Sequence, residues 1–420
     1  MSRSRRVVAP ALTAAAGLVL AGVVTGLAAG PADAHRGKTG KTFTIQSGTT
    51  LSGYDAATTK TGTTYVAWIG DKASTPGLRS LHLCVLKTSS KSCVGGVQTT
   101  SALGDSSAAN VKVVVTGSKV ELVWIAQLDP NSGEFSGVFG TNTVSHGKLG
   151  TSVAVPGAPS LGSLTSAIAH KGGGVSIAAV GESGTLDKRA YYYSTVSATP
   201  KTFKRPYFVG NAQLADNGKR TVLTTSQYGS LSGKVAVASK PSKGGKWTGF
   251  KNVKGSYTRG NIEQIITAGK KIRMVGVSAK AIYTPDSWTF KGKSFGRPKA
   301  SGDHNDISSI DLATDRSGRL ASVDSESGGL MVSNFGKGSS TARFLFKIKQ
   351  TQAGGPAQIT TRANGRGFLI WGIEKQGIPG QVLKAQAIKL PKPPKKHHHH
   401  HHRNARIGSA GLAFKSRGRS

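Results

Sequence analysis

The chain has 420 residues, a hydrophobic content of 37% and 56 glycines, and its formal net charge at neutral pH is +37. Recurrent apolar, β-branched runs argue against disorder across the body of the chain, and glycine together with many Ser and Thr indicates short strands joined by tight turns. The charge favours acidic partners, such as wall teichoic acids, anionic glycans, nucleic acid and anionic lipid surfaces; a purely solubilising role is the alternative.

The N-terminus has the pattern of a secretory signal. Arg3, Arg5 and Arg6 precede an apolar run at 7–29, and Ala34 closes an A-x-A-like motif. We expect cleavage after Ala34, and the alternatives are a retained membrane anchor and a twin-arginine signal. The mature protein is therefore predicted to be secreted, extracellular or associated with the cell wall, and no later stretch is apolar enough to span a bilayer.

A strand–turn–strand unit recurs along the rest of the chain. An apolar strand such as "YVAWI" at 65–69 follows each turn, and further strands follow it in most units. Four short antiparallel strands per roughly 40–50 residues are typical of a propeller blade. We predict an all-β, seven-bladed β-propeller of four-stranded antiparallel blades; six blades, or two β-sandwiches, are the alternatives. The units align on Gly62, Gly117, Gly173, Gly218, Gly269, Gly318 and Gly365.

The predicted domain boundaries follow from this repeat. The signal peptide occupies 1–34, the propeller 35–391 and a basic, His-rich flexible tail 392–420. "KTFTIQS" at 41–47 precedes the first unit and has no partner of its own. We expect it to supply the outer strand of the seventh blade and so to close the ring.

The repeated pattern, "(D/T)-x-x-G" and then "x-V-x-V-(A)-W", resembles secreted bacterial seven-bladed propellers of the NHL, YVTN and sialidase-like kind over residues 41–391. The resemblance implies an architecture and transfers no catalytic residue. The Asp-box and WD dipeptides at blade ends are absent from the sequence, and no arginine triad can be carried over from sialidases. It also contains no H-E-x-x-H, P-loop or dinucleotide motif.

Two cysteines, Cys84 and Cys93, flank a polar turn in "LCVLKTSSKSC". A hairpin would bring them face to face, and a disulfide is the expected state in an oxidising compartment. Such a bridge closes a short loop and would stabilise one hairpin.

Acidic residues that follow second strands, or that lie between blades, are expected at the funnel where loops of several blades converge. Carboxylates there could bind a sugar or a cation or act as an acid/base pair; the alternative is that they pair with the surplus Lys and Arg. The catalytic candidates are Asp71, Asp129 and Asp324. The ligand-binding candidates are Asp303, His304, Asp306, Glu326 and Glu374.

Aromatic residues occupy regular positions in the predicted strands. Trp68, Trp124 and Trp371 share one phase of the second strand, which predicts packing between blades, with a sugar-stacking platform as the alternative. The run "YYY" at 191–193 alternates across a strand, so at least one ring is expected to be exposed.

The tail leaves the blade pattern. "PKPPKK" predicts a stiff, extended segment, and the six consecutive histidines could bind zinc, nickel or copper. The run is either natural or an expression tag, and we favour a natural tract because 18 residues follow it. The candidate metal ligands are His397, His398, His399, His400, His401 and His402.

Together these features predict a non-catalytic, secreted propeller that binds a partner protein or an anionic cell-wall polymer or glycan. A glycan-active hydrolase or lyase using funnel carboxylates is the alternative, and a scaffold without a small ligand is a third reading. We expect a monomer that needs no cofactor, apart from a divalent metal at the His run or the funnel. Binding to nucleic acid would be non-specific.

Overall fold

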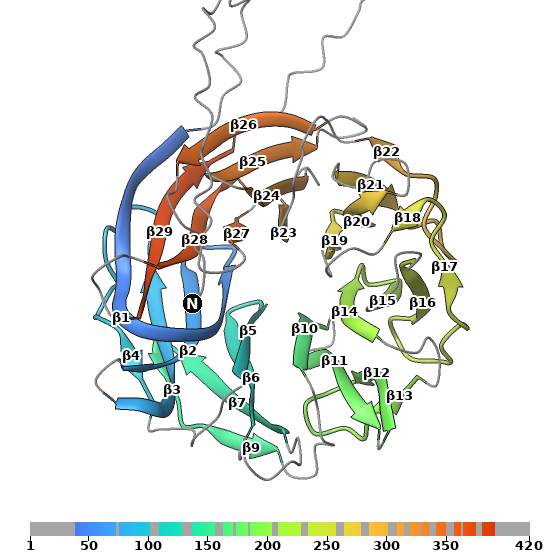
Figure 1. Ribbon diagram of the computed structural model, residues 1–420, viewed down its shortest axis with the longest axis horizontal. Coiled ribbons are helices and arrows are strands. Elements are labelled where there is room, and N and C mark those ends of the chain that lie inside the picture. The colour runs from blue at the N-terminus through green and yellow to red at the C-terminus, as the bar shows by residue number, and fades with distance from the viewer. Residues whose placement is uncertain are drawn as a thin grey trace, which may run out of the picture. The chain divides into compact units, whose positions relative to one another are not determined.

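The described part of the chain is all-β (Figure 1). It belongs to the compact unit His35–Ser420, and it contains no apolar helix of membrane-spanning length. The predicted signal peptide and the predicted tail lie outside the residues that the structure describes. The computed structural model describes residues 38–72, 75–100, 109–127, 137–155, 163–170, 174–183, 185–203, 209–227, 234–257, 264–278, 285–300, 309–314, 320–326, 329–335, 342–349, 357–362, 364–374 and 380–390.

Five sheets each form one blade of antiparallel strands, numbered two to six in chain order. Blade two consists of β5 (Ala109–Thr116), β6 (Lys119–Gln127), β7 (Gly137–Ser145) and β8 (Lys148–Leu149), with β9 (Val153–Val155) beside β7, and blade three consists of β10 (Ser163–Ala169), β11 (Val175–Ser183), β12 (Thr185–Tyr193) and β13 (Lys201–Thr202). Blade four consists of β14 (Val209–Asp216), β15 (Arg220–Gln227), β16 (Ala236–Pro241) and β17 (Lys251–Asn252), and blade five consists of β18 (Ser256–Tyr257), β20 (Lys271–Ser278), β21 (Pro285–Thr289) and β22 (Lys299–Ala300), with β19 (Gln264–Ala268) beside β20. Blade six consists of β23 (Ser309–Thr314), β24 (Leu320–Glu326), β25 (Gly329–Phe335) and β26 (Ala342–Lys349).

The sixth sheet joins the two ends of the propeller. Its order is β27 (Gln358–Thr361), β28 (Arg366–Glu374), β29 (Gln381–Lys389), β1 (Lys38–Thr58), β2 (Thr64–Lys72), β3 (Thr75–Leu86) and β4 (Gln98–Thr99). The first half of β1 pairs with β29 and its second half pairs with β2, and the change of partner comes at Thr49. Blade seven therefore ends on the first half of β1, and blade one begins on the second half. The closing role expected for residues 41–47 is confirmed.

The innermost strands contact one another in a closed cycle around the central axis (Figure 1). In the described part of the chain the cycle runs β1, β5, β10, β14, β19, β23, β27 and back to β1. One strand comes from each blade, so the described pairings make up seven blades. This arrangement confirms the predicted propeller of four-stranded antiparallel sheets and is not that of two packed sandwiches.

Glycines in left-handed conformation make the turn between the first and second strands, as the repeat predicts. Gly117 has a φ of 66°, and the aligned glycines of blades one, four, five and seven also have positive φ. An L side chain disfavours this conformation. In blade three Gly174 has a φ of 88°, and the aligned Gly173 and Gly318 lie outside the described residues.

The hydrophobic core lies between neighbouring blades, because both faces of each sheet are covered. Trp68, Trp124 and Trp371 are buried in three different clusters, which confirms that they pack between blades. The expectation of an exposed ring at 191–193 is wrong. Tyr191 and Tyr193 pack against blade two and Tyr192 packs against blade four, so all three rings are buried.

Cys84 and Cys93 form the predicted disulfide, with 5.2 Å between their Cα atoms. Cys84 lies on β3 and Cys93 lies in the turn that leads to β4, so the bond fixes the outer part of blade one.

Candidate functional site

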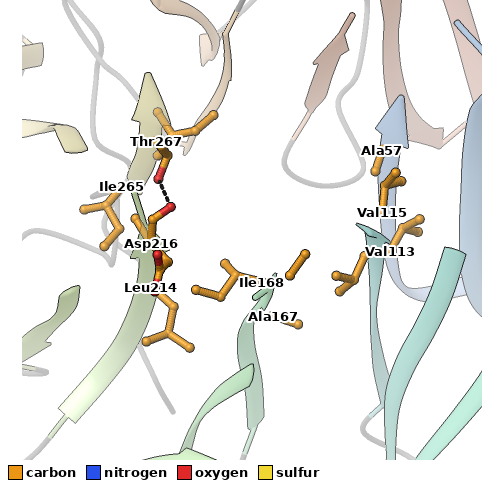
Figure 2. A pocket seen from close by; sticks show the side chains of 13 residues that line it. Ala57, Val113, Val115, Ala167, Ile168, Leu214, Asp216, Ile265 and Thr267 are labelled. Atoms are coloured by element: carbon orange, nitrogen blue, oxygen red, sulfur yellow. Dashed lines mark hydrogen bonds between the residues drawn. The ribbon is translucent and has the colours of Figure 1, made fainter. Parts of the chain in front are cut away.

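The ring of innermost strands encloses a channel, and a cavity of about 400 Å³ lies at one end of it. Residues near the C-terminal ends of β1, β5, β10, β14 and β19 line this cavity. Figure 2 shows the side chains of Ala57, Val115, Ile168 and Leu214 around the open space. Most of the lining is apolar.

Polar side chains on the innermost strands connect each blade to the next. The Asp55 carboxylate accepts a hydrogen bond from the N–H of Val113, at 2.7 Å, and joins blade one to blade two. The Asp311 carboxylate accepts one from the N–H of Ile359, also at 2.7 Å, and joins blade six to blade seven. These bonds satisfy backbone donors that would otherwise lack partners inside the ring.

Asp55 and Asp311 also interact electrostatically with each other and with Lys112 of β5. The pKa of the Asp311 carboxyl is raised to about 7, chiefly by burial and in part by the negative charge of Asp55. Burial likewise raises the pKa of Asp55, while Lys112 lowers it. A carboxyl group that titrates near neutral pH can hold or release a proton in the working range of an enzyme. By the exposed area of the whole residue, Asp55 and Asp311 are half-buried.

The edge of the ring next to the cavity carries two kinds of turn. Inner turns follow β1, β5, β10, β14, β19 and β27, and outer turns follow β3, β7, β12, β16 and β21; in a four-stranded antiparallel blade both lie at the same edge. Asn217 Nδ2 donates to the carbonyl of Lys270, at 3.0 Å, and Arg362 Nη1 donates to that of Thr61, at 3.2 Å. Neighbouring inner turns therefore touch, and we call this edge the turn face.

The turn face is strongly basic. Twenty Lys and Arg side chains are exposed among those that the structure describes, whereas Glu374 alone of the described carboxylates is exposed, and it lies at the opposite end of β28. Fourteen of the twenty lie in the inner or outer turns or pair with the strand end that enters them. The fourteen are Lys60, Lys87, Lys91, Lys119, Lys148, Lys201, Lys219, Lys243, Lys246, Lys270, Lys271, Lys291, Lys293 and Arg366.

Ser176, His170 and Asp216 lie in the order of a catalytic triad beside the turn face, but the serine is inaccessible. His170 Nδ1 is 3.8 Å from Asp216 Oδ2, and its Nε2 forms a hydrogen bond with Ser176 Oγ. Ser176 is fully buried and donates to the carbonyl of Ser194, at 2.9 Å. Burial lowers the pKa of His170, although Asp216 opposes the shift. The group therefore connects blades three and four and offers no nucleophile to a substrate.

A comparison with models of protein families finds no match, and neither does a comparison with curated proteins. Among solved structures, the polysaccharide lyase Uly1 matches 78% of this chain and 88% of its own with 11% identity and a TM-score of 0.49. The β-propeller domain of the Trilobed protease from Pyrococcus furiosus covers 80% of this chain and 95% of its own, with 11% identity and a TM-score of 0.46.

Trypanosoma rangeli sialidase, in complex with 2,3-difluoro-KDN, covers 84% of this chain, with 8% identity and a TM-score of 0.47. The match spans 58% of the sialidase chain. At such identities the likeness concerns the fold alone, so no residue role is carried over to this chain.

Two of the predicted site residues can be placed with their side chains. Asp71, at the end of β2, is buried, accepts a hydrogen bond from the N–H of Thr50 at 3.2 Å, and interacts electrostatically with Arg79. Glu374 is exposed at the end of β28, and the register brings both acids to the same edge of the seven-stranded sheet, away from the turn face. This is the edge where the sequence places the funnel.

The other predicted site residues cannot be placed in this way. Asp324 and Glu326 lie on β24, of which only the backbone is described at these positions. The described residues contain no group of three His, Cys, Asp or Glu side chains suited to a metal ion. Asp129, Asp303, His304, Asp306 and His397 to His402 lie outside the described residues.

Sequence reasoning missed Asp55, Asp311 and the turn face, although the sequence carries a signal for each. Asp55 and Asp311 stand seven residues before Gly62 and Gly318, and Asn110 stands seven before Gly117. A polar side chain at one phase of the innermost strand thus repeats with the turn glycine. A Lys or Arg likewise occurs in or beside each of the seven aligned turns.

Proposed function

We propose that the protein is a secreted, non-catalytic propeller that binds an anionic cell-surface polymer through its turn face. The observation that supports the proposal is the set of fourteen exposed cations on that face, where no exposed carboxylate occurs among the described side chains. A surface of one sign concentrates polyanions, and each phosphate that it binds releases counterions, so binding needs no deep cleft.

Four lysines of the inner turns give a sharp test, because four other exposed lysines lie away from the turn face. The test variant replaces Lys60, Lys119, Lys219 and Lys270 by Gln, and the matched control replaces Lys234, Lys251, Lys254 and Lys299 by Gln. Both variants lose the same net charge. Binding to poly(glycerol phosphate) is measured by calorimetry over a series of salt concentrations.

We expect the test variant to bind at least about tenfold more weakly in low salt, and its salt slope to fall by roughly one unit for each phosphate that the missing lysines no longer neutralise. The control variant should retain the affinity and slope of the native protein. Equal losses in the two variants would show that net charge, and no particular face, attracts the polymer. Binding that ignores salt would contradict the proposal altogether.

A second candidate function is glycan cleavage by a hydrolase or lyase reaction, and the carboxyl groups of Asp55 and Asp311 favour it. Asp311, with a pKa of about 7, has the protonation behaviour of a general acid, and Asp55 lies close enough to influence it. If this pair is catalytic, Asp311→Asn should abolish turnover of uronate-containing or phosphorylated oligosaccharides while leaving their binding intact. No turnover by the native protein would leave Asp311 as a connection between blades.

A further inference from the structure

The cavity on the turn face differs chemically from the cations that surround it. Ala57, Val113, Val115, Ile168, Leu214 and Ile265 supply apolar side chains from five innermost strands (Figure 2). The two polar members of the lining are Thr267 and Asp216, and both are already bonded within the protein. Thr267 Oγ1 donates to the backbone carbonyl of Asp216 at 2.8 Å.

The Asp216 carboxylate is fully engaged by its own turn and by the turn after β16. It accepts hydrogen bonds from the N–H of Gly218 and the hydroxyl of Thr221, both at 2.6 Å, and from the hydroxyl of Ser242 at 2.9 Å. A sugar ring needs several convergent polar partners in its pocket. The described lining offers no polar side chain that is unbonded, so the cavity suits a hydrocarbon tail.

Exposed cations lie directly beyond this apolar wall. Lys60 comes three residues after Ala57, and Lys119 comes four residues after Val115. Lys219 and Lys270 come three residues after Asp216 and Thr267, which also line the cavity. Because the innermost strands end at the inner turns, these ammonium groups belong to the edge at which the cavity lies. A ligand whose chain enters the cavity therefore meets positive charge where it emerges.

We propose that the channel binds a single-chain anionic amphiphile, with its hydrocarbon tail in the cavity and its phosphate or carboxylate against the inner-turn lysines. A volume of about 400 Å³ holds about a dozen methylene groups, at the roughly 30 Å³ that a water-sized group occupies in a liquid. The inference shares its lysines with the proposed function, but the apolar cavity that takes the tail is independent of it.

Alkyl phosphates of increasing length test the site on the full chain, below their critical micelle concentrations. Each added methylene should tighten binding about fourfold from butyl to decyl phosphate, and the gain should stop near twelve carbons. Ala167→Leu, which fills part of the cavity, should weaken decyl phosphate at least tenfold. Ala198→Leu, in the β12–β13 turn, is the matched control and should leave its affinity unchanged.

The outcomes separate this inference from the proposed function. If poly(glycerol phosphate) without acyl chains binds native and Ala167→Leu proteins alike, while decyl phosphate binds the native protein far better, the tail site is supported. If the polymer binds but decyl phosphate binds no better than butyl phosphate, the tail site is wrong and the proposed function stands. If decyl phosphate alone binds, the tail site stands and the polymer proposal fails.

Discussion

Asp311→Asn should make the protein more stable at pH 8 and remove much of the loss of stability that the native protein shows between pH 5 and pH 8. The carboxyl of Asp311 has a pKa of about 7, against an ordinary value of 3.8, chiefly because it is buried. The folded state therefore holds this proton more tightly than the unfolded state does.

The sign of the effect follows from proton binding. The contribution of a group whose pKa rises on folding is fully present below its unfolded pKa and is lost as the pH rises through its folded pKa. For Asp311 that window runs from about pH 4 to about pH 7, and the loss by pH 8 is about 4 kcal/mol at 1.36 kcal/mol per pKa unit. Asparagine carries no such charge, and its side-chain oxygen can still accept the N–H of Ile359.

Urea denaturation at pH 5 and pH 8 measures the effect. Glu374→Gln, which removes an exposed carboxyl, is the control and should follow the pH profile of the native protein. Asp311→Ala should be less stable than Asp311→Asn at both pH values, because it leaves a buried backbone donor without its acceptor. A native protein whose stability does not change over this range would contradict the interpretation of Asp311 as a buried, protonated group.

The architecture could be read from the sequence because the propeller repeats a local signal. A left-handed turn needs a glycine whatever surrounds it, so Gly62, Gly117 and Gly365 mark equivalent turns without any knowledge of the fold. Ring closure could also be inferred, since the strand at 41–47 has no partner in its own neighbourhood.

Side-chain environments were harder to predict, because they depend on the neighbouring blade. Strand alternation predicts one buried and one exposed face for Tyr191–Tyr193, yet blades two and four cover both faces. In the sequence, Lys60 and Lys119 are two of many lysines that together give the chain its excess of positive charge. Only the topology shows that their turns gather at one edge, beside an apolar cavity that five separate strands build.

Gly367→Ala should destabilise the protein by about 3 kcal/mol or more, the upper range for overpacking. Gly367 lies on β28 in blade seven and pairs with Thr361 of β27. A Cβ at this position would overlap the carbonyl oxygen of Thr360 and lie 2.7 Å from the Cα of Thr361. Both are backbone atoms of the adjacent strand, so no side-chain rotation relieves the clash, and β27 must separate from β28 in the blade that closes the ring.

Two other glycines separate this clash from the general effects of substituting a glycine. Gly249→Ala adds a methyl group in open space and is expected to change stability by less than about 0.5 kcal/mol. Gly117→Ala also meets open space but imposes a φ of 66° on alanine, which costs roughly 1–2 kcal/mol. Urea denaturation should rank the losses Gly367→Ala, Gly117→Ala and then Gly249→Ala. If Gly367→Ala were as stable as Gly249→Ala, the close pairing of β27 with β28, and the tight seventh blade that it implies, would be wrong.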